Sequence, residues 1–272
     1  MKECVLLLVL SVVVTCCFAD SWEMTATTTK FPLKIMQPLV FEGLCTDGKH
    51  FIMNTKYSIF VMDTHLNVLE STLSAIPLDL LEEGYNHLGD CACDVRAGLC
   101  YYAVEEPTKI KPSIFVYNVT DTGLVFVTEH HELMQSHMPW VAFDSVTRFL
   151  YSSEYDDVTQ LQVYSADTLE YLHSLPLSGT ATPLNNVQGG SFYEEKLYVG
   201  VNSGDSVYEI NVITGEVELA IQQQEKDSDG EYEFEGLTFL DLREEGRGLM
   251  HNTGNHLHPQ VMYHAERAQK DN

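Results

Sequence analysis

The tetrapeptide Phe41-Glu42-Gly43-Leu44 recurs near the end of the chain as Phe234-Glu235-Gly236-Leu237. The copies are separated by about four times 48 residues, which suggests an internal repeat of roughly that length. Stepping from Glu42 at this period reaches three intermediate positions, each followed by a short strand, an acidic turn and a second strand. These positions are Leu88-Gly89-Asp90, Met138-Pro139-Trp140 and Gln188-Gly189-Gly190.

Strand signals dominate each repeat, because short apolar runs alternate with Gly, Asp, Asn and Thr turns and helical periodicity is nearly absent. A third strand in each repeat has a recurring apolar centre: Phe60-Val61-Met62, Val116-Tyr117, Val163-Tyr164, Val207-Tyr208 and Val261-Met262-Tyr263. Four strands in about 40 to 50 residues is the size of a propeller blade. The sequence therefore predicts an all-β, five-bladed β-propeller with four antiparallel strands per blade.

The last repeat ends soon after Tyr263 without a fourth strand, whereas the stretch 24–29 precedes the first inner strand. We expect the N-terminal segment to supply the outer strand of the last blade, since such closure removes an exposed sheet edge. First and last blades would then adjoin, and Glu42 and Glu235 would lie close together at the axis. A pair of β-sandwiches is the alternative fold, but it does not explain the period.

The N-terminus has the pattern of a secretory signal peptide. Lys2 precedes a short apolar run, and Cys17-Phe18-Ala19 supplies small residues at the expected cleavage site. We expect cleavage after Ala19, so that 1–19 is the signal peptide, 20–264 the propeller and 265–272 a flexible tail. An uncleaved anchor is the alternative. No later segment is apolar enough to span a bilayer, so we expect a secreted, extracellular protein without stable membrane insertion.

The cysteines beyond the signal peptide are Cys45, Cys91, Cys93 and Cys100. An even number in an oxidising compartment favours disulfides. We expect Cys93 to pair with Cys100 across a hairpin, and Cys45 with Cys91 between neighbouring blades. Zinc is the alternative, but a second ligand pair at suitable spacing is missing. Asn118-Val119-Thr120 is an acceptor sequence for N-glycosylation, at the turn between a third and a fourth strand.

The formal net charge of −25 limits the kinds of partner. Nucleic acid is disfavoured, because phosphates would be repelled and no basic patch is present. Cations and basic ligands would be attracted, although solubility accounts for most of the carboxylates. The partner class is left open as a small molecule, a peptide or a protein.

The first strand of each propeller blade lines the axis, so aligned positions form a ring. The positions aligned by the period are Glu42, Gly89, Pro139, Gln188 and Glu235, with His87 and Asp90 beside the second. No Lys or Arg is expected near this ring, and oxygen donors at such density suit Ca²⁺. The candidate metal ligands are Glu42, Asp90, Gln188 and Glu235. Alternatively, the two glutamates bond backbone amides in the channel and hold water.

The ends of the second strands return to the same face of a propeller. Candidate ligand-binding residues there are Asn54, Glu105, Glu154, Asn202 and His251, joined by His87. Trp140 is expected either to floor a ligand pocket or to pack inside a blade. Zinc-protease and nucleophile-elbow hydrolases are disfavoured, since Gln135 replaces the second His of His131-Glu132 and no Gly-x-Ser-x-Gly occurs.

Two segments, Val187-Gln188-Gly189-Gly190 and 233–238, resemble inner strands of the last two blades of plant- and bacterial-type glutaminyl cyclases. Members of that family are secreted or periplasmic five-bladed propellers that cyclise N-terminal Gln to pyroglutamate. Gly190 stands where the family has Leu, and Val199-Gly200-Val201-Asn202 where it has Glu-Ser-Thr-Gly. Lactonase-type and esterase-like phytase propellers also have Glu-Gly-Leu inner strands, and their sites bind Ca²⁺.

Three functions are compatible with these features. The first is a secreted propeller that binds a polar or cationic ligand, with Ca²⁺ a candidate, at the axial channel. The second is a Ca²⁺-dependent hydrolase of lactonase or phosphoesterase type, in which the metal polarises the scissile group or activates water. The third is a glutaminyl-cyclase-like enzyme. Glu42 and Glu235 are the candidate catalytic residues, with Glu235 as general acid/base in the third.

Overall fold

The computed structural model describes residues 22–30, 41–105, 111–202, 206–222, 232–256 and 260–267. The expected signal peptide at 1–19 lies outside the described residues. The last described strand ends at Arg267, so it runs into the segment expected to be a tail from Ala265. In the described part of the chain, no helix has the length and apolar character needed to cross a membrane.

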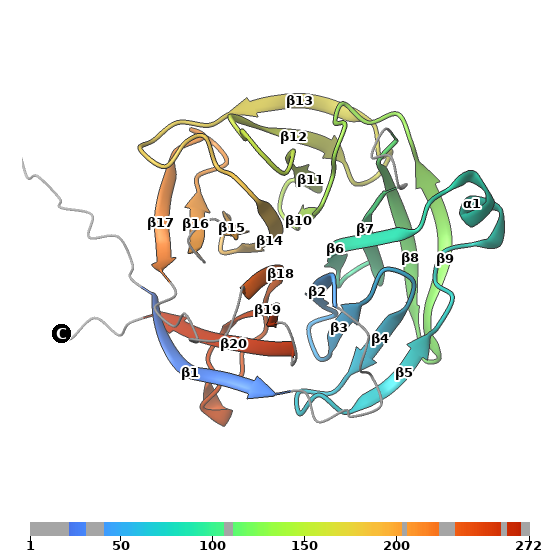
Figure 1. Cartoon of the computed structure of the whole chain (residues 1–272), viewed down its shortest axis with the longest axis horizontal. Coiled ribbons are helices and arrows are strands. Elements are labelled where there is room, and N and C mark those ends of the chain that lie inside the picture. The colour runs from blue at the N-terminus through green and yellow to red at the C-terminus, as the bar shows by residue number, and fades with distance from the viewer. Residues whose placement is uncertain are drawn as a thin grey trace, which may run out of the picture.

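The described strands form five four-stranded antiparallel sheets around a central axis (Figure 1). The first sheet contains β2 (Gly43–Thr46), β3 (Phe51–Asn54), β4 (Ile59–Met62) and β5 (Val68–Thr72). The second contains β6 (His87–Asp94), β7 (Leu99–Glu105), β8 (Ser113–Thr120) and β9 (Gly123–His130). The third contains β10 (Ala142–Asp144), β11 (Phe149–Ser152), β12 (Gln160–Ser165) and β13 (Tyr171–Pro176).

The fourth sheet contains β14 (Val187–Tyr193), β15 (Lys196–Val201), β16 (Ser206–Ile210) and β17 (Val217–Gln222). The fifth contains β18 (Tyr232–Phe239), β19 (Met250–His256), β20 (Gln260–Arg267) and β1 (Trp22–Lys30). Helix α1 (Leu78–Glu83) lies between the first two sheets in the chain, and a 3₁₀ turn, η1 (Arg243–Glu245), follows β18. The predicted all-β propeller of four-stranded antiparallel blades is confirmed.

The N-terminal strand closes the ring of blades. β1 pairs antiparallel with β20, from Trp22 opposite Arg267 to Lys30 opposite Val261, and Figure 1 shows it on the outside of the last blade. Trp22 is buried, and its ring lies 5.6 Å from that of Tyr198 in the fourth blade. The first strand of the chain is thus the outer strand of the last blade, as predicted.

The acidic turns after the inner strands have a common cause. Asp47, Asp94 and Asp144 each accept a hydrogen bond from the backbone N–H two residues later, at 2.9, 3.0 and 2.8 Å. A short carboxylate that bonds the backbone just ahead of it favours a turn over further strand. The recurring aspartates therefore end the inner strands and start the first hairpin of these blades.

Both predicted disulfides are confirmed. Cys45 of β2 is bonded to Cys91 of β6, which ties the first blade to the second. Cys93 of β6 is bonded to Cys100 of β7, directly opposite it in the antiparallel ladder. The four cysteines therefore join β2 of the first blade to β6 and β7 of the second.

The carboxylate of Asp90 lies fully buried among the inner strands. Its Oδ1 accepts the backbone N–H of Leu44 at 2.8 Å, and its Oδ2 accepts that of Gly190 at 3.1 Å. The backbone N–H groups of Cys91 and Leu237 also donate to it. Its own N–H donates to the carbonyl of Pro139 at 2.9 Å. One residue thus bonds to the inner segments of all five sheets, and burial raises the pKa of its carboxyl group.

Glycines allow the inner segments to approach this carboxylate. A Cβ on Gly236 would lie 2.4 Å from the backbone N of Leu44, and one on Gly89 would lie 2.3 Å from the carbonyl O of Pro139. At Gly43 and Gly189 the nearest atoms are side-chain oxygens of Asn54 and Asp90, at 2.6 and 3.0 Å. At Gly236 and Gly89 glycine is required because the nearest atoms belong to backbone, which cannot move aside as a flexible side chain can.

These contacts correct the alignment of the repeats by one residue. The shared glycine position contains Gly43, Gly89, Gly189 and Gly236, with Pro139 in the third blade. The residues equivalent to Glu42 are therefore Leu88, Met138, Gln188 and Glu235, whereas Gly89 and Pro139 were expected there. Asp90 falls at the position that follows the glycine and points into the centre of the fold.

Replacing Asp90 with Asn should destabilise the protein by about 3 kcal/mol, because an amide NH₂ would face backbone N–H groups that have no other acceptor. Denaturant unfolding of Asp90→Asn measures the loss. Asp121→Asn, at an exposed turn, is the matched control and should change the unfolding free energy little. Equal stability of the two variants would contradict the central role of Asp90.

Candidate functional site

A cavity of about 320 Å³ opens at the end of the axis where the inner strands begin and the second strands end. All five blades contribute to its wall. The lining residues are Glu42, Lys56, His87, Gly89, Glu105, His137, Met138, Pro139, Tyr155, Gln188, Glu233 and Glu235. Five residues predicted from the sequence are therefore brought together there: Glu42, His87, Glu105, Gln188 and Glu235.

Glu42 comes directly before β2, and only 8% of it is exposed. Its Oε2 lies 3.0 Å from Nε2 of His87, and its Oε1 lies 3.7 Å from Nζ of Lys56. The expectation that no Lys or Arg would be near the ring is wrong, because Lys56 lies on this wall. Lys56 follows shortly after the end of β3 at Asn54. The ends of second strands return to the axial face, so extending the prediction slightly beyond Asn54 would have included Lys56.

A second carboxylate–imidazole pair lies on the neighbouring blades. Glu105 ends β7 and is buried, and its Oε1 lies 3.2 Å from Nε2 of His137. The backbone N–H of Met138 donates to the same oxygen at 2.8 Å. Burial alone would raise the pKa of Glu105, but the bonds from His137 and Met138 outweigh it, and the pKa is lowered. The carboxylate form of Glu105 is therefore favoured.

The opposite wall comes from the fourth and fifth blades. Glu233 and Glu235 are two residues apart on β18, and Gln188 is the second residue of β14, the neighbouring inner strand. The side-chain amide of Gln188 donates to Oε1 of Glu233 at 3.4 Å. Glu235 is 3% exposed, whereas Glu233 is exposed at the mouth. This wall therefore presents side-chain oxygens of Gln188, Glu233 and Glu235, with Glu235 buried and Glu233 exposed at the mouth.

The basic side chains of the cavity lie on one side of it. Lys56, His87 and His137 all come from the first three blades or the segments that lead into them, and each histidine there is paired with a glutamate. The fourth and fifth blades contribute only Gln188, Glu233 and Glu235 to the lining. A ligand with a positive end and a hydrogen-bond-accepting end matches such a division.

Several predicted site residues lie outside the cavity. Trp140 is fully buried, donates from Nε1 to Oγ of Ser153 at 3.0 Å and packs on Gly190, so it belongs to the blade core. His251 is fully buried, with Nε2 2.6 Å from the carbonyl O of Leu240. Asp90 is enclosed by backbone N–H groups, which corrects the expectation that it faces the channel as a metal ligand.

Glu154 and Asn202 support the wall from behind. Glu154 accepts the backbone N–H groups of Ser136 and His137, each at 2.9 Å, and so holds the loop that carries His137. The side-chain carbonyl of Asn202 accepts the backbone N–H of Phe234, between the two glutamates of β18. Both predicted residues thus orient lining residues without lining the cavity themselves.

Besides the five predicted residues that line the cavity, sequence reasoning missed four polar lining residues: Lys56, His137, Tyr155 and Glu233. Glu233 is two residues before Glu235 in a strand, so period-two alternation would have placed both on one face. Tyr155 directly follows the candidate Glu154 at a second-strand end. His137 lies in the long loop before β10, where no strand pattern fixes its direction, and its ring centroid lies 5.3 Å from that of Tyr155.

The described residues contain no group of three or more His, Cys, Asp or Glu side chains arranged to hold a metal ion. The acceptor asparagine Asn118 is exposed near the end of β8, where a glycan would be tolerated. N-glycosylation there stays a prediction.

Neither protein-family models nor curated protein sequences match this chain. Among solved structures, it is similar to the crystal structure of Myxococcus xanthus glutaminyl cyclase. The TM-score is 0.62 at 12% identity, and the match covers 92% of this chain and 98% of that one. At this identity the match shows a shared propeller fold. The resemblance to glutaminyl cyclases noted from the inner strands therefore holds at the level of fold.

The lowered pKa of Glu105 makes its contribution to stability depend on pH. A carboxyl group whose folded-state pKa lies below the ordinary 4.5 stabilises the fold above that value, and this is lost as pH falls through the folded-state pKa. Unfolding free energies measured at several pH values should show wild type and Glu105→Gln converging below about pH 4.5. Glu218→Gln, on an exposed strand face, should show no such convergence. A pH-independent difference for Glu105→Gln would contradict the assignment.

Proposed function

We propose that the axial cavity binds a small ligand that carries a protonated amine close to a hydrogen-bond acceptor, such as the amino-terminal residue of a peptide. The observation that carries the proposal is the distribution of charged side chains around the wall. Glu233 and Glu235 stand on one side. Lys56, His87 and His137 stand on the other, where the two histidines pair with Glu42 and Glu105. The carboxylates would receive the amine, and the basic side chains would donate to a carbonyl or carboxylate oxygen.

The volume supports a small ligand. About 320 Å³ lies at the lower end of the range for small-molecule pockets. The overall charge of −25 would raise the local concentration of cationic ligands. An amine is also favoured over Ca²⁺ by the contacts of the carboxylates, since Glu42 and Glu105 already have imidazole partners. Calcium usually takes six to eight oxygen ligands.

Export from the cell is part of the same proposal. The two disulfides fit an extracellular protein, and the N-terminal pattern of the sequence supports a cleaved signal peptide. The ligand would then be an extracellular amine or peptide.

Calorimetry with alanyl-glycine tests the binding proposal. Wild type should bind this dipeptide more tightly than N-acetyl-alanyl-glycine, which lacks the cation, and than propylamine, which lacks the acceptor. Glu235→Gln should weaken binding about tenfold or more, since it removes a charged hydrogen-bond partner worth roughly 1.5–3 kcal/mol. Glu218→Gln, which removes the same charge from the outer strand β17, should bind like wild type.

Two results would contradict it: equal affinity for the free and acetylated dipeptides, or no effect of Glu235→Gln. Calcium chloride provides the comparison with the metal alternative. A rise of the melting midpoint with millimolar Ca²⁺ that is lost in Glu42→Gln and Glu235→Gln would favour the metal instead, because a ligand that binds only the native state stabilises it.

Glutaminyl-cyclase-like catalysis is the second candidate, favoured by the match to 98% of the length of the Myxococcus xanthus glutaminyl cyclase. In such a reaction the amino nitrogen attacks the side-chain amide carbon of the same residue and ammonia leaves. A proton must move from the attacking nitrogen to the leaving nitrogen. Buried Glu235 is suited to carry it as general acid/base, with Glu42 on the adjoining blade as the second catalytic candidate.

Conversion of glutaminyl-alanine to pyroglutamyl-alanine and ammonia, followed by mass spectrometry, tests this candidate. Glu235→Gln should slow the reaction by about 10²- to 10⁴-fold, the usual contribution of a positioned acid/base, whereas Glu218→Gln should not. Product formation no faster than in buffer would exclude the activity. It would leave the binding proposal intact, since that is measured with a dipeptide that cannot cyclise in this way.

A further inference from the structure

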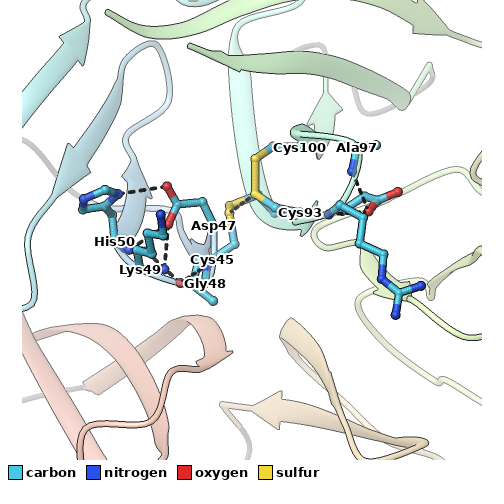
Figure 2. The surroundings of a disulfide bond; sticks show 12 residues. Cys45, Asp47, Gly48, Lys49, His50, Cys93, Ala97 and Cys100 are labelled. Carbon is cyan, nitrogen blue, oxygen red and sulfur yellow. Dashed lines mark hydrogen bonds and ion pairs between the residues drawn. A yellow bond between two sulfur atoms is a disulfide. The ribbon is translucent and has the colours of Figure 1, made fainter. Parts of the chain in front are cut away.

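Two disulfides lie next to each other between the first two blades. Figure 2 shows Cys45 beside the bond between Cys93 and Cys100. Cys45 is bonded to Cys91, and Cys93 is bonded to Cys100. The Sγ atoms of Cys45 and Cys93, which belong to different disulfides, lie only 3.6 Å apart. The two bridges therefore touch each other as well as the strands that they join.

The backbone explains why Cys45 meets two partners. Cys91 and Cys93 are two residues apart in β6, so their side chains project from the same face of that strand. Cys45, on β2, lies against this face and contacts both. Cys100 instead lies opposite Cys93 on β7. Cys45 is therefore positioned to bond with either cysteine of β6, whereas Cys100 faces only Cys93 in the ladder.

The four sulfurs differ in their access to solvent. Cys45, Cys91 and Cys100 are buried, whereas Cys93 is partly exposed. An external thiol would therefore reach Cys93 more easily than the other three cysteines. Exchange proceeds by attack of a thiolate on a disulfide sulfur, so access and contact between sulfurs decide which bonds react.

We propose that this cluster is a thiol–disulfide exchange site, in which opening of Cys93–Cys100 transfers the bond of Cys45 from Cys91 to Cys93. A dithiol reductant attacks Cys93, releases Cys100 as a thiolate and forms a mixed disulfide. Its second thiol then closes on the first, which frees the Cys93 thiolate and leaves the reductant as its own disulfide. The Cys100 thiolate takes up a proton, and the Cys93 thiolate stays available for the next step.

The internal step follows from the sulfur contact. The Cys93 thiolate attacks Sγ of Cys45, the Cys45–Cys91 bond breaks, and Cys91 leaves as a thiolate that is then protonated. The net change is one disulfide, Cys45–Cys93, and two thiols, Cys91 and Cys100, with two electrons supplied by the dithiol. The link between the first two blades survives, because Cys45 stays attached to β6.

Released Cys91 directly follows Asp90, whose carboxylate accepts the backbone N–H of Cys91. The exchange thus removes a covalent constraint next to the buried carboxylate at the centre of the fold. It keeps the covalent link that orders the first blade against the second.

The variant Cys100→Ser tests the internal step, since it leaves Cys93 as a thiol in the oxidised protein. Purified variant, alkylated at low pH and digested, should yield a Cys45–Cys93 linked peptide and alkylated Cys91. Cys93→Ser is the matched control. It leaves Cys100 as the thiol, and only Cys45–Cys91 is expected. A Cys100→Ser protein that contains only Cys45–Cys91 and free Cys93 would overturn the proposal.

Wild-type protein provides a second test that needs no substitution. One equivalent of dithiothreitol under native conditions, followed by the same trapping, should yield Cys45–Cys93 with alkylated Cys91 and Cys100. Alkylation of Cys93 and Cys100 alone, with Cys45–Cys91 intact, would contradict the exchange even if the variants fold poorly. Detection of Cys45–Cys93 would support it, because the oxidised fold does not contain that bond.

Discussion

The propeller depends on the buried carboxylate of Asp90. A sheet that packs around an axis has backbone N–H groups at its inner edge, and a buried N–H without an acceptor costs about as much as a lost hydrogen bond. Asp90 accepts such groups from four inner strands, and its own N–H bonds to the segment before the remaining one. A single side chain thus replaces the water that a wider channel would hold.

This bond network depends on the small residue that precedes it in each repeat, which is glycine in four of the repeats and Pro139 in the third. Inner segments reach one carboxylate only if their backbones nearly touch, and the space left for a Cβ at Gly236 or Gly89 is below any ordinary contact distance. The residue that follows this position then points into the fold, as Asp90 does after Gly89 and Trp140 after Pro139. The residue before it begins the wall of the cavity, as Glu42, Gln188 and Glu235 do. Packing at the axis therefore determines which side chains line the cavity.

Much of the fold was predictable from the sequence, because the spacing of the repeated motif gives the length of one blade. The strands, the closure by β1 and both disulfides follow from spacing and from strand and hairpin rules. The role of Asp90 did not follow. An acidic residue next to a glycine, in a ring that also contains Glu42 and Glu235, suggests a cation ligand. Only the structure shows that its oxygens are buried and accept backbone N–H groups instead. The alignment was wrong by one residue in the second and third repeats. Leu88 and Met138 occupy the position of Glu42 there, and neither has a carboxylate that would identify it.

The two sides of the cavity follow from the closure of the ring. At the position of Glu42, the second, third and fourth blades contain Leu88, Met138 and Gln188, so carboxylates at this position occur only in the first and last blades. β1 joins these two blades, which places Glu42 and Glu235 on adjoining blades around the same cavity. Basic residues come instead from the ends of strands and loops of the first three blades. A polar ligand would therefore meet its carboxylates at the seam where the chain closes on itself, and binding there would favour the closed ring.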